Sequence, residues 1–217
     1  MELEGVGHVS DVLARAQDLL ARGGGLATFA VGAFAECNAW LGRFDQARAF
    51  VRQHELLWRE AGRTNPTELA GVVELWAGQP AAAETAVRPV VDAQEAHGDL
   101  GHGAGSLAVL SRAVLAQGRA EEALALLDKL ERWAAPEDVL TQGELRIVRG
   151  RALGDPALVR EAIELLEPTE YLNLRARAWL ELQALSGEGA ARALELYERK
   201  GNEVGARLAR DLVERTE

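Results

Sequence analysis

The sequence predicts an all-α fold, a solenoid of antiparallel helix pairs, and two observations carry this prediction. A turn that begins with glycine recurs five times, at Gly42, Gly78, Gly118, Gly154 and Gly187. The intervals of 36, 40, 36 and 33 residues between these glycines are typical of stacked helical repeats. Ala, Leu, Glu and Arg, which are good helix formers, fill most of the segments between the turns.

Capping signals and glycines set the expected helix boundaries. Asp155-Pro156 places a side-chain acceptor at an N-cap and proline at the first helical position, where no backbone N–H is needed. Gly62, Gly98 and Gly201 follow helices at points where the left-handed conformation that ends a helix favours glycine. We expect helices at residues 9–22, 26–41, 44–61, 66–77, 80–97, 103–117, 120–134, 137–153, 156–167, 169–186, 188–200 and 203–215.

Each repeat combines two kinds of helix. The first, such as residues 26–41, is apolar on several sides and is expected to pack between neighbours. The second, such as residues 120–134, has apolar residues on one face and charged residues elsewhere, so one face meets water. The chain therefore divides into an N-terminal capping helix within 1–25, five helix pairs within 26–200 and a C-terminal capping helix within 201–217, all in a single domain 1–217.

Two segments depart from the regular pattern. Pro89 lies inside the expected helix 80–97, where it removes a hydrogen bond, and we expect a kink there. Four glycines between Gly98 and Gly105 coincide with the longest interval between turns. This segment is either a flexible joint of the solenoid or an ordinary surface loop.

Composition and charge exclude several classes of function. The net charge is −10, and nucleic-acid affinity depends largely on Lys and Arg, so we expect no direct nucleic-acid binding. The longest uncharged run, residues 23–35, is shorter than the roughly 20 residues that span a bilayer. Residues 1–4 are acidic and lack the apolar region of a signal peptide. We therefore expect a cytoplasmic protein with no membrane partner, and a buried Cys37.

The first glycine turn continues into a Gly-x-Phe-x-x-Ala pattern, from Gly42 to Ala47. The small residues at equivalent positions of the first three repeats are Ala35, Gly71 and Ser111 before the turn, and Ala47, Ala83 and Ala123 after it. This pattern resembles the tetratricopeptide repeat (TPR), and the resemblance covers nearly the whole chain. It implies a right-handed superhelical solenoid of about five TPR-like repeats plus flanking helices, with the small residues where helices cross.

A narrower resemblance concerns the C-terminal helix pair. Residues 193–210 resemble the closing helices of TPR-like regions in bacterial signalling proteins, which follow a nucleotide cyclase or an ATPase-linked, LuxR-type transcription regulator. The turn at residues 95–99 is similar to theirs, and all but two of the 24 basic residues are arginine, as is common in GC-rich genomes. The resemblance implies a regulatory part of a larger bacterial regulator.

Motifs for catalysis, cofactors and metals are weak. A phosphate-binding loop follows a strand and ends with a lysine. The glycines at 101–105 have neither a strand before them nor a lysine after them. His97 and His102, with Asp99 between them, lack the ligand spacing of a zinc site and are expected to be solvated loop residues. The carboxylates follow amphipathic helices in the manner of a solvated surface. We therefore expect no enzyme activity, no cofactor and no metal.

The repeat register places nine residues on the groove side of the first helices: Glu36, Trp40, Glu68, Trp76, Arg112, Glu144, Arg151, Arg177 and Glu181. Trp40 and Trp76 lie two residues before successive turn glycines. They either anchor a partner at the groove or pack in the core, because Trp76 continues an apolar helical stripe that begins at Leu69. Trp58, Trp133 and Trp179 are expected in the core.

These observations favour a non-catalytic protein–protein interaction and regulatory module that binds a protein or peptide in its concave groove. The alternatives are a sensor that closes around a small molecule or peptide and, less favoured, a helical enzyme. A bound segment is expected to place basic residues near Glu36 and Glu68 and acidic residues near Arg151 and Arg177, because complementary charge sets the orientation of binding.

Overall fold

The structure is a computed structural model that describes residues 7–63 and 67–216. The acidic residues 1–4 and the expected helix start at residue 66 lie outside these ranges. Within them the chain forms twelve helices and no strand, which confirms the all-α prediction. The helices are α1 (Val9–Arg22), α2 (Gly25–Trp40), α3 (Phe44–Glu60), α4 (Leu69–Trp76), α5 (Pro80–His97), α6 (Leu100–Ala116), α7 (Ala120–Trp133), α8 (Val139–Leu153), α9 (Pro156–Leu166), α10 (Leu172–Ser186), α11 (Ala190–Lys200) and α12 (Glu203–Thr216).

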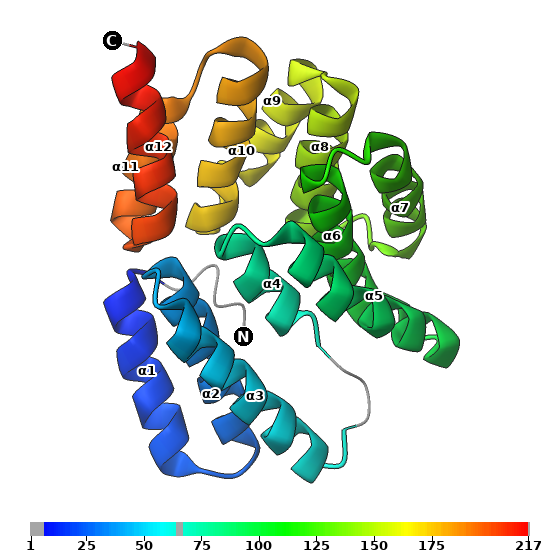
Figure 1. The fold of residues 1–217 in the computed structure, drawn as a ribbon, viewed down its shortest axis with the longest axis vertical. Coiled ribbons are helices and arrows are strands. Elements are labelled where there is room, and N and C mark those ends of the chain that lie inside the picture. Colours follow the sequence, from blue (N-terminus) through cyan, green and yellow to red (C-terminus); the bar gives the residue numbers. More distant parts are fainter. Residues whose placement is uncertain (1–6, 64–66, 217) are drawn as a thin grey trace.

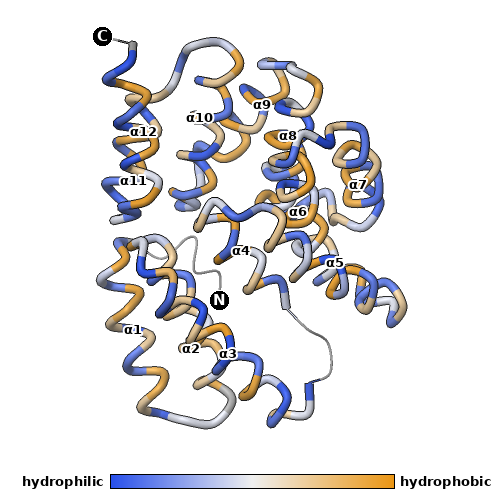
Figure 2. Tube along the Cα trace, in the orientation of Figure 1, coloured by the Kyte–Doolittle hydropathy of each residue, from blue (hydrophilic) through white to orange (hydrophobic). Residues whose placement is uncertain are grey.

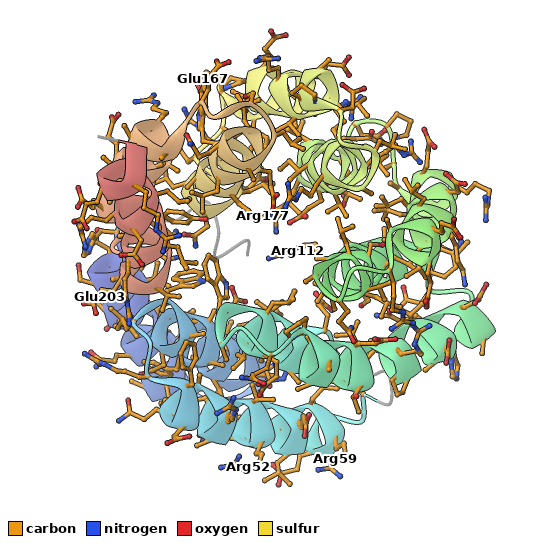
Figure 3. All side chains as sticks on the ribbon, turned by 45° about the horizontal axis from the view of Figure 1, so that its top comes forward. Arg52, Arg59, Arg112, Glu167, Arg177 and Glu203 are labelled. Atoms are coloured by element: carbon orange, nitrogen blue, oxygen red, sulfur yellow. The ribbon has the colours of Figure 1, made fainter. Side chains whose placement is uncertain are left out.

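The helices lie in two layers around a central opening (Figures 1 and 3). Each helix packs against the next along the chain, and α2, α4, α6, α8 and α10 also contact one another in succession. These five helices form the inner layer, whereas α3, α5, α7 and α9 lie outside them (Figure 3). Because the first helix of every pair contacts both its own partner and the next pair, the packing is that of a solenoid-like helical repeat.

The alanines after the turns lie where paired helices approach closely. Ala47, Ala83 and Ala123 are all fully buried. Before the second turn, Gly71 is equally constrained, because a Cβ at that position would collide with Val87 and lie 3.3 Å from the backbone oxygen of Ala83. The predicted register of small residues is therefore the register in which the helices pack.

Hydrophobic residues are spread over all helices rather than gathered in one block (Figure 2). The buried residues form a series of clusters along the solenoid, from one around Val12 and Phe34 to one around Leu196 and Ala209. This distribution is expected when each helix pair buries its apolar faces against its neighbours. No helix in the two described ranges is long and apolar enough to cross a membrane.

The glycine-rich segment is helical over most of its length. Gly98 ends α5 in the left-handed conformation, with φ 70°, but α6 begins at Leu100 and runs through the next three glycines. Position 103 requires glycine because a Cβ there would lie 2.7 Å from Cζ3 of Trp133. Gly103 thus allows close approach of α6 and α7, and the expected surface loop is wrong from Leu100 onward. Pro89 also leaves α5 continuous as a helix from Pro80 to His97.

The last helices pack back against the first, so the solenoid closes into a ring (Figures 1 and 3). Helix α12 contacts α2. Trp76 and Tyr197 make an edge-to-face contact with ring centroids 6.1 Å apart, and Lys200 Nζ lies 5.1 Å from the centre of the Trp40 ring. A Cβ on Gly201 would lie 2.7 Å from Val9 Cγ1. We call this closing contact, formed by Trp40, Trp76, Tyr197, Lys200 and Gly201, the seam.

Candidate functional site

Three adjoining cavities occupy the interior of the ring, with volumes of about 170, 450 and 460 Å³. Arg112 from α6 and Arg177 from α10 line all three. Both side chains extend from the inner helices toward the central opening in Figure 3, whereas Arg52, Arg59 and Glu167 lie on the outside. We call the combined space the central channel and its smallest part the inner cavity.

Eight of the nine residues predicted for the groove line the central channel. The inner cavity is lined by Glu36, Glu68, Trp76, Arg112, Glu144 and Arg177, and the 460 Å³ cavity adds Arg151 and Glu181. They come from α2, α4, α6, α8 and α10, one helix of each pair, with Glu68 at the N-cap of α4. The repeat register thus brings together residues that are far apart in the sequence.

Trp40 is the exception, and its placement in the groove is wrong. Its side chain is 0% exposed in a cluster of apolar residues at the start of the solenoid, where Lys200 covers its ring. Trp76 is half-buried and lines the inner cavity. The equivalent positions differ because Lys200 covers the ring of Trp40, whereas Tyr197 meets Trp76 edge to face and leaves it partly exposed. Trp58, Trp133 and Trp179 are half-buried rather than fully enclosed in the core.

A buried carboxylate lies between two arginines on one side of the channel. Arg177 Nη2 forms an ion pair with Glu144 Oε2, and Arg112 Nη1 lies 3.7 Å from Glu144 Oε1. Burial alone would raise the pKa of Glu144, but the charges of Arg177 and Arg112 outweigh it and lower that pKa. Glu144 is therefore ionised at neutral pH, and the group carries an excess positive charge.

The opposite charge gathers on the side formed by α2 and α4. Glu36 and Glu68 line the inner cavity beside Trp76, and Ser106 Oγ donates a hydrogen bond to Glu68 Oε2 at 3.1 Å. At the wider end of the channel, Arg151 Nε lies 3.3 Å from Glu181 Oε2. The channel therefore presents separate acidic and basic regions rather than a uniform charge.

Sequence reasoning missed Asn173, which lines the inner cavity and is only 2% exposed. Asn202 Nδ2 donates to Asn173 Oδ1 at 2.8 Å, and Asn202 Oδ1 accepts from the backbone N–H of Gly205 at 2.9 Å. Asn173 precedes Arg177 by four residues and so shares its face of α10. That spacing from a predicted groove residue is the signal that identifies it.

Other candidate chemistry does not assemble into a site. Burial and the nearby charge of Glu36 raise the pKa of Cys37 to about 12, against a smaller opposite effect of Lys200. His102 Nδ1 lies 2.9 Å from Asp99 Oδ1 on the exposed surface. Within residues 7–63 and 67–216 no three His, Cys, Asp or Glu side chains are grouped to hold a metal ion.

Comparisons with known proteins do not assign the chain to a family. No family model, no curated protein and no solved structure matches it. The central channel and its residues are therefore the basis for what we propose about function.

Proposed function

We propose that this chain is a cytoplasmic, non-catalytic interaction and regulatory module that binds a segment of a protein partner in the central channel. One observation carries the proposal: eight charged or aromatic residues, from five successive helix pairs, line two adjoining cavities in the interior of the ring. Solenoids use surfaces assembled in this way, with one helix of each repeat contributing, to bind extended partners.

The resemblance of the glycine turns to the TPR pattern supports this class of function. Buried alanines at equivalent positions of successive pairs are what that pattern requires. By the same resemblance we propose that the chain belongs to a bacterial signalling or transcription regulator, in which partner binding in the channel would control an activity elsewhere.

The charges of the channel set the expected direction of the bound segment. Its basic residues would lie near Glu36 and Glu68, and its acidic residues near Arg151 and Arg177. Such complementarity contributes mainly to the association rate and the orientation of the partner. Since the net charge of the chain is −10, a partner with more basic than acidic residues is favoured.

Charge reversal in the channel tests the proposal. Peptide libraries with basic N-terminal or C-terminal halves would be screened by fluorescence anisotropy. With a selected peptide, the double variant Glu36→Lys/Glu68→Lys should bind at least tenfold more weakly at low salt, with a smaller loss at high salt.

The matched control reverses two exposed carboxylates on outer helices, Glu121 on α7 and Glu164 on α9. Glu122 is unsuitable as a control because it accepts a hydrogen bond from Arg119 Nε at 2.8 Å. Equal loss of binding in the channel variant and the control variant would show that the channel is not the binding surface.

The closed seam favours a second candidate, a sensor of a small molecule. An open solenoid offers a groove along its whole length, but here α12 contacts α2 and encloses the channel. An inner cavity of about 170 Å³ is smaller than the roughly 300 to 1,000 Å³ typical of pockets for drug-sized ligands. A metabolite about the size of an amino acid fits this space better than an extended peptide segment does.

A further inference from the structure

The inner cavity has a different charge on each side. Glu36 and Glu68 come from α2 and α4, whereas Arg112 and Arg177 come from α6 and α10. Glu144 lies between the two arginines and offsets one of their charges. Guanidinium groups thus line the side of α6 and α10, and carboxylates line the side of α2 and α4.

On the basic side, hydrogen-bond donors are left without acceptors. Nε of Arg177 and Nδ2 of Asn173 are buried and meet no acceptor among the residues that the structure describes, whereas Nη2 of Arg177 is occupied by the ion pair with Glu144. A buried donor without an acceptor costs about 1 to 3 kcal/mol, so such donors gathered on one face of α10 point to an acceptor that binds there.

The orientation of the Asn173 amide is fixed by its neighbours. The backbone N–H of Gly205 must donate, so the atom of Asn202 that it contacts is the oxygen, and the Asn202 nitrogen therefore donates to Asn173. Asn173 must then use its own oxygen in that bond, which leaves its NH2 group as the donor on the other side. Gly205 cannot be replaced without disturbing this chain, because a Cβ there would lie 2.6 Å from Tyr197 Cδ1.

We propose that the inner cavity binds a small zwitterion with an apolar body, namely a free apolar amino acid or a dipeptide. The carboxylate accepts hydrogen bonds from Asn173 and Arg177, close to Arg112. The ammonium group binds between Glu36 and Glu68, where it also lies beside Trp76. This inference rests on the proposed function only because it places the ligand within the same channel. It names a ligand for the inner cavity.

The size and walls of the cavity select the rest of the ligand. A volume of about 170 Å³ corresponds to roughly five or six times the 30 Å³ that a water molecule occupies in the liquid. The apolar part of the lining is Val72, Ala108, Val109, Leu140 and Leu174. A branched aliphatic or aromatic side chain buries its surface against these residues, whereas a longer peptide does not fit within the cavity.

Ligand analogues test each charged end on the unmodified protein. L-leucine, L-phenylalanine and the dipeptide Gly-Leu would be titrated by isothermal titration calorimetry. The carboxylate-only analogue 4-methylpentanoate and the amine-only analogue 3-methylbutylamine should each bind at least tenfold more weakly than L-leucine. Tighter binding of L-leucine would identify a free amino acid as the ligand, and tighter binding of Gly-Leu would identify a dipeptide.

Two variants locate the binding. Glu68→Gln removes the charge at the ammonium end, and Arg177→Lys keeps a charge at the carboxylate end but loses the forked donors. Each should weaken binding by about tenfold, while Glu164→Gln, on the exposed face of α9, should not. Circular dichroism checks that each variant is folded, and the analogue series remains decisive if Arg177→Lys unfolds.

Three results would overturn the inference. They are the absence of saturable binding by all three zwitterions, equal affinity of either single-charge analogue, and unchanged affinity in a folded Glu68→Gln variant. The Glu36→Lys/Glu68→Lys experiment alters the same cavity, but it measures the binding of a selected peptide, whereas the titrations here measure the binding of free zwitterions. Peptide binding that is lost in that variant, with no binding of any zwitterion to the unmodified protein, would overturn this inference and leave the proposed function standing. Failure of the ligand inference and failure of the proposed function are therefore distinguishable.

Discussion

At the scale of single residues, the structure separates side chains that pack from side chains that are available for binding. Trp40 and Trp76 occupy equivalent repeat positions, yet only Trp76 lines the inner cavity. The sequence leaves both interpretations open because the repeat register defines a position relative to neighbouring helices. It does not define what the far end of the chain covers, and Lys200 comes from that far end.

Cys37 should be inert in the folded protein. Its thiol is fully buried, and burial together with the charge of Glu36 raises its pKa to about 12, so hardly any thiolate forms at pH 8. We expect no reaction with Ellman's reagent under native conditions and one equivalent of released thiolate in denaturant. Rapid reaction of the native protein would mean that α2 opens frequently.

Glu84 should make the stability of the protein sensitive to acid. A hydrogen bond from Arg88, opposed by burial and aided by hydrogen bonds from Gln117 and Arg119, lowers its pKa from 4.5 to about 2. A lowered pKa in the folded state stabilises the fold above about pH 4.5, and this contribution is lost as the pH falls toward 2.

Glu84→Gln should therefore lower Tm at pH 7, and the difference in Tm from the unmodified protein should narrow between about pH 4.5 and pH 2. Thermal unfolding followed by circular dichroism measures both. Glu121→Gln, on the exposed surface of α7, serves as the control and should show no such difference. A gap in Tm that stays constant with pH would contradict the assigned role of this carboxylate.

At the scale of helices and helix pairs, capping and periodicity predicted most boundaries to within a few residues, as for α1 and α5. Capping and periodicity are local signals, and the helix boundaries in the structure follow them. The prediction failed at residues 98–105, where glycines usually indicate a loop. The reason is tertiary: Gly103 lies against Trp133, and the benefit of that packing exceeds the roughly 1 kcal/mol that a glycine costs within a helix.

Close approach at the helix crossings predicts that added volume destabilises them. Ala83 is fully buried where α4 meets α5, whereas its neighbour Ala82 is exposed. Ala83→Leu should lower the free energy of unfolding by about 1 to 3 kcal/mol, and Ala82→Leu should change it by less than about 0.5 kcal/mol. Chemical denaturation measures both, and similar stabilities of the two variants would show that the repeat register is wrong.

At the scale of the whole molecule, the channel residues could be predicted and the ring could not. A repeat register states which side chain faces inward, and so it found eight of the residues that line the channel. Whether successive pairs rotate enough to bring α12 against α2 depends on small angles summed over all pairs, which no local pattern encodes. Asn173 was missed for a related reason, because its partner Asn202 belongs to the helix pair that closes the ring.

Weakening the seam should expose the first helices as well as the last. Tyr197 is 1% exposed and contacts Trp76 across the seam, so Tyr197→Ala should cost about 3 to 5 kcal/mol. Limited proteolysis with mass spectrometry should then detect faster cleavage in α1 and α2. Leu127→Ala, a fully buried change in α7, is the control of comparable cost, and it should accelerate cleavage near α7 instead.

Closure of the ring also bears on how the chain folds. An open repeat array makes only short-range contacts, so it can nucleate at any pair and grow outward. The contacts of Tyr197 with Trp76 and of Lys200 with Trp40 join residues from opposite parts of the chain, which raises the contact order. They can form only after the intervening pairs are in place. We therefore expect ring closure to be the last step of folding, with the channel acquiring its shape only at that step.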